Sequence, residues 1–135
     1  PIVTQHGDFN PHNILLKNNS LKVVDWEDSI IKYIPHLDFY HFFIASPYII
    51  TKGNDTRSKK YTFEDNWYTE MMLEELHRYC LKMEMESETF KSLFPLYLIM
   101  MANKDMESQR GILQSSKYWI NLLDIYLKHK NFLRY

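Results

Sequence analysis

Two stretches carry most of the information in this chain: residues 6–13, which read HGDFNPHN, and residues 24–27, which read VDWE. The first stretch lies within residues 2–13, where His, Gly, Asp, Asn and Pro follow one another closely, a composition that favours an ordered loop. It holds Asp8 and Asn13 five positions apart, and the second holds Asp25 twelve positions after Asn13. These three oxygen-bearing side chains are the candidate functional residues.

The residues between the two stretches predict a β-hairpin. Two short apolar runs, 13–17 and 21–26, flank a polar turn at 18–20. Such a hairpin folds the chain back on itself and returns Asp25 to the side of Asn13. We therefore expect Asp8, Asn13 and Asp25 to converge at one end of the hairpin.

This combination of side chains suits phosphoryl transfer. One carboxylate and one amide oxygen, without a cage of further ligands, suit Mg²⁺, which keeps its waters and completes its shell with substrate phosphates. A separate carboxylate nearby can accept a proton from an incoming hydroxyl. Phosphotransferases divide the labour in this way between metal ligands and a catalytic base.

With these motifs the chain resembles the kinase-like phosphotransferases, the family that includes the aminoglycoside phosphotransferases and the choline kinases. The residues 6–13 match the catalytic loop of that family, and 24–27 match its metal motif. A third match is Pro35-His36-Leu37-Asp38, where the family has P-x-x-D. Phe9 and Asn10 stand where Leu and His are common, and neither position is a ligand. The resemblance is confined to residues 5–45.

The resemblance implies a role for each matching residue. Asp8 would be the catalytic base, and Asn13 and Asp25 would bind Mg²⁺, with Asp25 as the ligand that bridges the nucleotide phosphates. His6 would hold the catalytic loop against the metal motif. Asp38 would brace the loop from the helix that follows it.

The resemblance also implies the fold and the activity. Residues 1–135 would form one domain, mainly α with a small β-hairpin (α+β), equivalent to the C-terminal lobe of a protein-kinase-like fold. The N-terminal nucleotide-binding lobe would be absent from this chain, which would then be inactive alone. The complete enzyme would move the γ-phosphate of ATP or GTP to a hydroxyl of a small molecule: an aminoglycoside, a choline-like alcohol or a sugar.

Other interpretations stay open. The chain could be a non-catalytic fragment or a pseudokinase-like binding module, although Asp8, Asn13 and Asp25 are all intact. Asp and Asn also favour turns for purely structural reasons. A further alternative takes His6, Asp8 and His12 as ligands of zinc or iron, but their spacing is unfamiliar for such a site.

Composition excludes several classes of protein. The 135 residues are 45% hydrophobic and 24% charged, as in globular domains, and a net charge of -1 argues against a nucleic-acid partner. One cysteine suits a reducing compartment, so we expect a cytoplasmic protein. Three glycines leave no Gly-rich phosphate loop. The longest apolar run, 94–102, is too short to span a membrane.

After Pro35 the chain is predicted to be helical, apart from a polar loop at 51–60. The first expected helix is 36–45, which Pro47 should end. A second should begin at a cap formed by Thr62, with Asp65 three positions later. A third, 88–104, should be capped by Ser87 and broken at Pro95, and the last is 111–130. We expect buried stripes of Tyr68, Met72, Leu76, Tyr79 and Met83 on the second of these helices, and of Ile112, Trp119, Leu123 and Tyr126 on the last. Leu96 to Ala102 is apolar all round and predicts a central segment.

The other titratable groups have ordinary structural interpretations. His36, His41, His77 and His129 are expected to be packed or surface residues, and Cys80 to lie in the core. The stretch 64–88 holds eight acidic residues, which favours a solvated helix face. An acidic wall for a cationic acceptor is the functional alternative.

Overall fold

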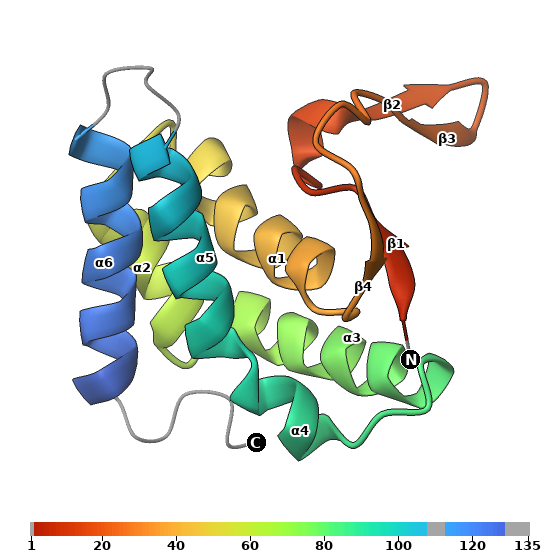
Figure 1. Ribbon diagram of the computed structural model, residues 1–135. Coiled ribbons are helices and arrows are strands. Elements are labelled where there is room, and N and C mark those ends of the chain that lie inside the picture. The colour runs from red at the N-terminus through yellow and green to blue at the C-terminus, as the bar shows by residue number, and fades with distance from the viewer. Residues whose placement is uncertain (1, 108–112, 129–135) are drawn as a thin grey trace.

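The computed structural model describes residues 2–107 and 113–128, in which short strands precede a set of helices (Figure 1). The fold is α+β and mainly helical, as predicted. Its elements are β1 (Val3–Gln5), the 3₁₀-helix η1 (Pro11–Asn13), β2 (Ile14–Lys17), β3 (Ser20–Val23), β4 (Ile30–Tyr33), α1 (Leu37–Ile50), α2 (Asp55–Phe63), α3 (Trp67–Lys82), α4 (Ser87–Ser92), α5 (Phe94–Glu107) and α6 (Leu113–Lys128).

The predicted hairpin is confirmed, and a second pair of strands accompanies it. β2 and β3 pair antiparallel, with Ile14 opposite Val23. Asn18 and Asn19 make the turn with positive φ angles of 51° and 57°, which Asn tolerates better than most residues. β1, which the sequence places in a loop, pairs antiparallel with β4 and ties the start of the chain to the segment before α1. In Figure 1 the β2–β3 hairpin projects away from the helices.

The helix predicted for 36–45 continues through Pro47 to Ile50, so the prediction of its end was wrong. Proline lacks an N–H, and inside a helix it leaves the carbonyl four positions back without its usual donor. Here that carbonyl belongs to Phe43, and it accepts a hydrogen bond of 2.8 Å from the hydroxyl of Tyr68 on α3. A tertiary contact therefore replaces the missing helical bond.

The segment predicted as a loop, 51–60, becomes helical from Asp55 onward, which corrects the prediction. Asn54 caps α2, and its side-chain oxygen accepts a hydrogen bond from a backbone N–H of the first turn. The fully buried residues of α2, Ser58 and Thr62, are polar, and Ser58 is hydrogen-bonded to the hydroxyl of Tyr118 on α6 at 2.9 Å. Hydrophobic periodicity did not reveal this helix because its most deeply buried side chains are polar.

The cap of α3 was also predicted wrongly. Thr62 lies inside α2, and its hydroxyl donates to the carbonyl of Ser58 at 3.0 Å. Asn66 is the cap, with a side-chain oxygen that accepts from two backbone N–H groups of the first turn. Thr69, rather than Asp65, completes the capping box by accepting from the Asn66 N–H at 3.1 Å.

The helix predicted for 88–104 is split near Pro95, as expected, into α4 and α5. Its predicted cap is not confirmed: Ser87 is the first residue of α4, and Glu86 precedes it without a side-chain capping bond. α5 is not buried all round, since Leu96 and Ile99 are 41% and 45% exposed.

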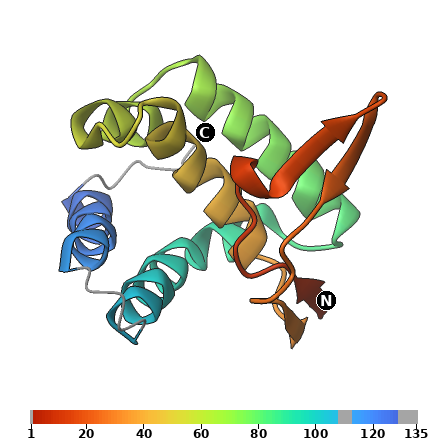
Figure 2. The same cartoon turned by 90° about the horizontal axis from the view of Figure 1, so that it is seen from above.

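The core lies where α1, α3, α5 and α6 meet. Tyr40 and Ile44 of α1, Leu76 of α3, Tyr97 of α5 and Leu122 of α6 are all fully or almost fully buried. α1 passes through the middle of the helices, and α5 runs beside α6 (Figures 1 and 2).

The predicted helix stripes are partly confirmed. Tyr68, Met72 and Leu76 are buried as expected, and Cys80 lies with them in the core, whereas Tyr79 and Met83 are only partly covered. On α6 the stripe is shifted: Trp119 is buried, while Leu123 and Tyr126 are half-buried. Ile112 and His129 lie outside the described residues.

No helix within residues 2–107 and 113–128 has both the length and the apolar character needed to cross a membrane.

Candidate active site

The loop 6–9 is held to α1 through its backbone. The N–H groups of His6 and Gly7 donate to the two carboxylate oxygens of Asp38, the latter at 2.9 Å. The N–H of Asp38 in turn donates to the side-chain oxygen of Gln5 at 2.9 Å. The hydrogen bonds expected between Asp38 and the loop are therefore confirmed, and they fix the loop on the first turn of the helix.

Glycine is required at position 7. Its φ of +85° lies in the left-handed region, and a Cβ added there would stand 2.1 Å from the carbonyl oxygen of Asp28. Lys104 of α5 contacts the same two residues. Its ammonium donates to the carbonyl of Gly7 at 3.3 Å and to the carboxylate of Asp28. The loop therefore packs between the segment that carries Asp28 and the helix α5.

His6 joins the loop to the segment that carries Asp25. Its Nε2–H donates to the carbonyl of Val24 at 2.7 Å, and its ring packs against Trp26 at a centroid distance of 4.7 Å. The side chain is 2% exposed. His6 therefore joins the loop 6–9 to residues 24–26, while the role that the resemblance gives to it stays a prediction.

The carboxylate of Asp8 accepts hydrogen bonds from three described side chains. Oδ1 accepts from Nε2 of His41 at 2.9 Å and from Nδ2 of Asn10 at 3.1 Å, and Oδ2 accepts from Nδ2 of Asn13 at 3.1 Å. The hydrogen bond from His41 lowers the pKa of Asp8 below its ordinary value, although partial burial acts in the opposite direction. Asp8 is therefore an ionised, partly exposed carboxylate in a fixed orientation.

Asn13 is buried beside Asp8 and next to the end of β3. Its amide nitrogen donates to both the carbonyl and the carboxylate of Asp8, at 2.9 and 3.1 Å. This leaves the amide oxygen for another partner. The backbone carbonyl of Asn13 accepts the N–H of Val24 at 3.0 Å, so the hairpin continues its pairing up to this residue.

Asp25 follows Val24 directly and is exposed. Its φ of +66° lies in the left-handed region, which Asp adopts more readily than most residues other than glycine. Within the described chain no hydrogen bond joins its side chain to Asp8 or Asn13. The structure thus brings Asp8 and Asn13 into contact and the backbone of Asp25 close to Asn13, while the shared metal shell stays a prediction.

His41 is the residue of this site that the sequence did not indicate. It was expected to be a packed or surface histidine; it is buried, and it also contacts Asp8. The available signal was its spacing from Asp38, because positions three apart lie on the same face of a helix. That spacing alone does not predict the contact between His41 and Asp8, because it does not show that this face of α1 packs against the loop.

The alternative metal site is not supported. The described residues contain no group of three or more His, Cys, Asp or Glu side chains that could hold a metal ion. His6 is engaged with Val24, and His12 is exposed on η1, so His6, Asp8 and His12 do not gather around one point.

The acidic stretch 64–88 behaves largely as a solvated helix face. Glu74 and Glu75 both form ion pairs with Arg78 on the same helix, and Glu88 pairs with Lys91. These local pairs neutralise part of the charge that an acidic wall would need.

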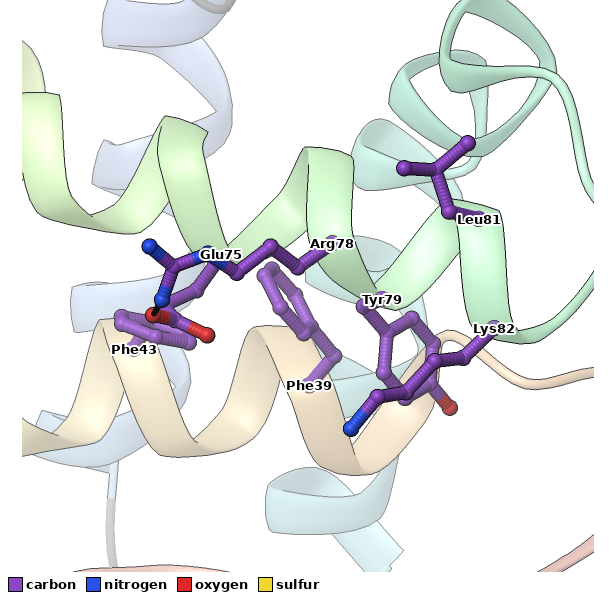
Figure 3. A pocket seen from close by; sticks show the side chains of 7 residues that line it. All are labelled: Phe39, Phe43, Glu75, Arg78, Tyr79, Leu81 and Lys82. Carbon is purple, nitrogen blue, oxygen red and sulfur yellow. Dashed lines mark hydrogen bonds and ion pairs between the residues drawn. The ribbon is translucent and has the colours of Figure 1, made fainter.

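Among the hollows near α1, two are lined entirely by residues that the structure describes. One, of about 320 Å³, borders the loop at Gly7 and is lined on the helical side by Met100 and Lys104. The other, of about 580 Å³, lies between α1 and α3, where Figure 3 shows the rings of Phe39 and Tyr79 between the two helices. None of the residues lining the second hollow belongs to the loop 6–13.

The chain matches no known protein-family model, no curated protein and no solved structure.

Proposed function

We propose that this chain is the helical catalytic lobe of a kinase-like phosphotransferase. Its complete form would move the γ-phosphate of ATP or GTP to a hydroxyl of a small molecule in the cytoplasm. The observation that carries the proposal is the arrangement around Asp8: its carboxylate is fixed by Asn13 and by α1, on a loop whose backbone is tied to Asp38. If Asp8 and Asn13 served only to form a turn, the bonds from His41 to Asp8 and from Gly7 to Asp38 would not be needed.

Asn13 and Asp25 carry the kind of oxygen atoms that magnesium takes as ligands. Mg²⁺ prefers oxygen ligands and keeps several waters. Asn13 turns its amide nitrogen toward Asp8, which leaves the amide oxygen for a cation, and Asp25 offers an exposed carboxylate at the end of the neighbouring strand. When bound there, Mg²⁺ would neutralise charge on the nucleotide phosphates.

The remaining residues would position the reacting groups. Asp8 would accept a hydrogen bond from the acceptor hydroxyl, orient it toward the γ-phosphorus and take its proton at a carboxylate oxygen. His6 and Asp38 would keep the loop in place on the body of the protein. The acceptor is open among aminoglycosides, choline-like alcohols and sugars.

Substitution of the two carboxylates should separate their roles. In the complete protein, Asp8→Asn should leave Mg-nucleotide binding largely intact and lower turnover by roughly 10²–10⁴-fold, as expected for a lost general base. Asp25→Ala should abolish magnesium-dependent nucleotide binding. Calorimetric titration with Mg-ATP and Mg-GTP measures binding, and a turnover assay over aminoglycosides, choline and simple sugars measures transfer.

Asp124→Asn is a matched control, because Asp124 is an exposed residue of α6 that pairs with Lys128. Full activity of Asp8→Asn would refute the role given to Asp8. Tight nucleotide binding by the 135-residue chain alone would refute the expectation that a second lobe is needed. A complete protein that binds a partner but transfers no phosphate to any of these acceptors would favour a binding module.

A further inference from the structure

His41 occupies an unusual place directly beneath Asp8. It is 5% exposed, and both of its ring nitrogens are engaged. Nε2 lies 2.9 Å from Oδ1 of Asp8, and Nδ1 lies 3.2 Å from the hydroxyl of Tyr97 on α5. The ring also packs against Trp119 of α6, at a centroid distance of 6.1 Å. Three helices therefore fix its position.

The direction of each hydrogen bond follows from the chemistry of the partners. An ionised carboxylate only accepts, so Nε2 of His41 carries the hydrogen that is donated to Asp8. In the Nε2–H tautomer Nδ1 is an acceptor, and the hydroxyl of Tyr97 can donate to it. Tyr97, His41 and Asp8 then form a directed series of hydrogen bonds that leads from the core to the loop.

These bonds distinguish the two oxygens of Asp8. Each carboxylate oxygen has about two lone-pair positions. At Oδ1 both are used, by His41 and Asn10, whereas at Oδ2 one is used, by Asn13. Oδ2 is therefore the oxygen with capacity for a further donor.

We propose that His41 is a positioning residue, which holds Oδ1 of Asp8 so that Oδ2 is presented to the acceptor hydroxyl; this inference rests on the proposed function. In the step concerned, the acceptor O–H bond breaks and its proton passes to Oδ2. The acceptor oxygen forms a bond to the γ-phosphorus, and the nucleoside diphosphate leaves with the electron pair of the broken P–O bond. Two residues of α1 thus hold the loop: Asp38 binds its backbone N–H groups, and His41 binds the side chain of Asp8.

A pair of nearly isosteric substitutions tests the donor itself. His41→Gln places an amide N–H close to the position of Nε2, whereas His41→Met has a similar shape and no donor. In the complete protein we expect His41→Met to lower kcat by about 10²-fold, the order of loss for a misplaced reacting group, with an unchanged KM for Mg-ATP. His41→Gln should recover most of this loss. His77→Met, at an exposed histidine of α3, is the control and should match the wild type.

Crystal structures of the same variants give a readout that does not need activity. Asp8 should leave its present orientation in His41→Met and keep it in His41→Gln. Equal kcat values for the two variants, or an Asp8 carboxylate that stays in place in both, would overturn the inference. If the wild type transfers no phosphate but Asp8 moves only in His41→Met, the proposed function fails and the positioning by His41 stands.

Discussion

At the scale of single residues, His36 is the least satisfied side chain in the described part of the chain. It is fully buried, and neither of its ring nitrogens makes a hydrogen bond. Its ring stacks on Tyr33 at a centroid distance of 5.7 Å. Burial lowers the pKa of His36 below its ordinary value of 6.5, and the nearby carbonyl of Ile34 opposes this shift without standing in hydrogen-bonding geometry.

We expect His36→Phe to stabilise the protein, because it removes unsatisfied polar atoms and keeps a stacked ring. The gain should be on the order of 1 kcal/mol at neutral pH. The lowered pKa of His36 also determines how the unfolding free energy changes with pH. As the pH falls below 6.5, position 36 takes up a proton more readily in the unfolded chain than in the folded chain, so the unfolding free energy decreases. His36→Phe should reduce this loss. Urea unfolding between pH 5 and 8 measures both effects.

The exposed His77 provides the control for this comparison. His77→Phe removes a histidine without removing a buried polar group, so it should leave the unfolding free energy at neutral pH almost unchanged. If the unfolding free energy of His36→Phe equals that of the wild type at every pH, burial of His36 does not destabilise the protein.

Sequence reasoning was most successful for residues whose partners lie close in the chain. The spacing of Asp8, Asn13 and the hairpin was sufficient to place the first two in contact, because a loop and one turn connect them. The bond from Asp38 to the loop was predicted through the resemblance. His41 was missed since its contact with Asp8 depends on how α1 packs, and no local pattern in the sequence encodes that packing.

At the scale of elements, the end of α1 depends on another helix. Pro47 cannot donate to the carbonyl of Phe43, and Tyr68 of α3 supplies the donor instead, at 2.8 Å. The chain therefore keeps a proline inside a helix without leaving a buried carbonyl unpaired. The same dependence on tertiary partners explains why the start of α2 was missed, because Ser58 is buried through a hydroxyl rather than through an apolar group.

Tyr68→Phe should cost about 1–3 kcal/mol of unfolding free energy, the penalty for a buried carbonyl left without a donor. In a Pro47→Ala background the cost should be much smaller, because the alanine would supply the helical N–H that proline lacks. A double-mutant cycle, with urea unfolding of the four proteins, measures this coupling.

Tyr61→Phe is a suitable control, since the ring of Tyr61 packs edge-on against Tyr68. It should show the same small effect in the wild-type and the Pro47→Ala backgrounds. An equal cost of Tyr68→Phe in both backgrounds would mean that the hydroxyl of Tyr68 does not replace the missing helical bond.

At the scale of the whole molecule, buried tyrosine hydroxyls connect helices that are distant in the chain. Three examples in the described part of the chain, besides the bond between Tyr97 and His41, link α1 with α4, α3 with α1, and α6 with α2: Tyr40 to the carbonyl of Phe90, Tyr68 to that of Phe43, and Tyr118 with the hydroxyl of Ser58. The scaffold under the loop is therefore joined by groups that can ionise.

Burial raises the pKa of all three tyrosines, that of Tyr118 from 10.0 to about 12 and those of Tyr40 and Tyr68 still higher. The folded chain then holds these protons at a pH where the unfolded chain releases them. Their contribution to stability is complete below pH 10 and is lost as the pH rises through the folded values.

We therefore expect alkaline unfolding to be a single transition above pH 10, in which helical circular dichroism is lost as the buried tyrosines ionise. Each of these hydroxyls must leave the core before it can lose its proton, so ionisation should follow unfolding. Tyr118→Phe removes one titrating group and should make the transition less steep in pH. Full tyrosine ionisation with the helices intact would contradict this order, because it would show that these side chains reach water without unfolding.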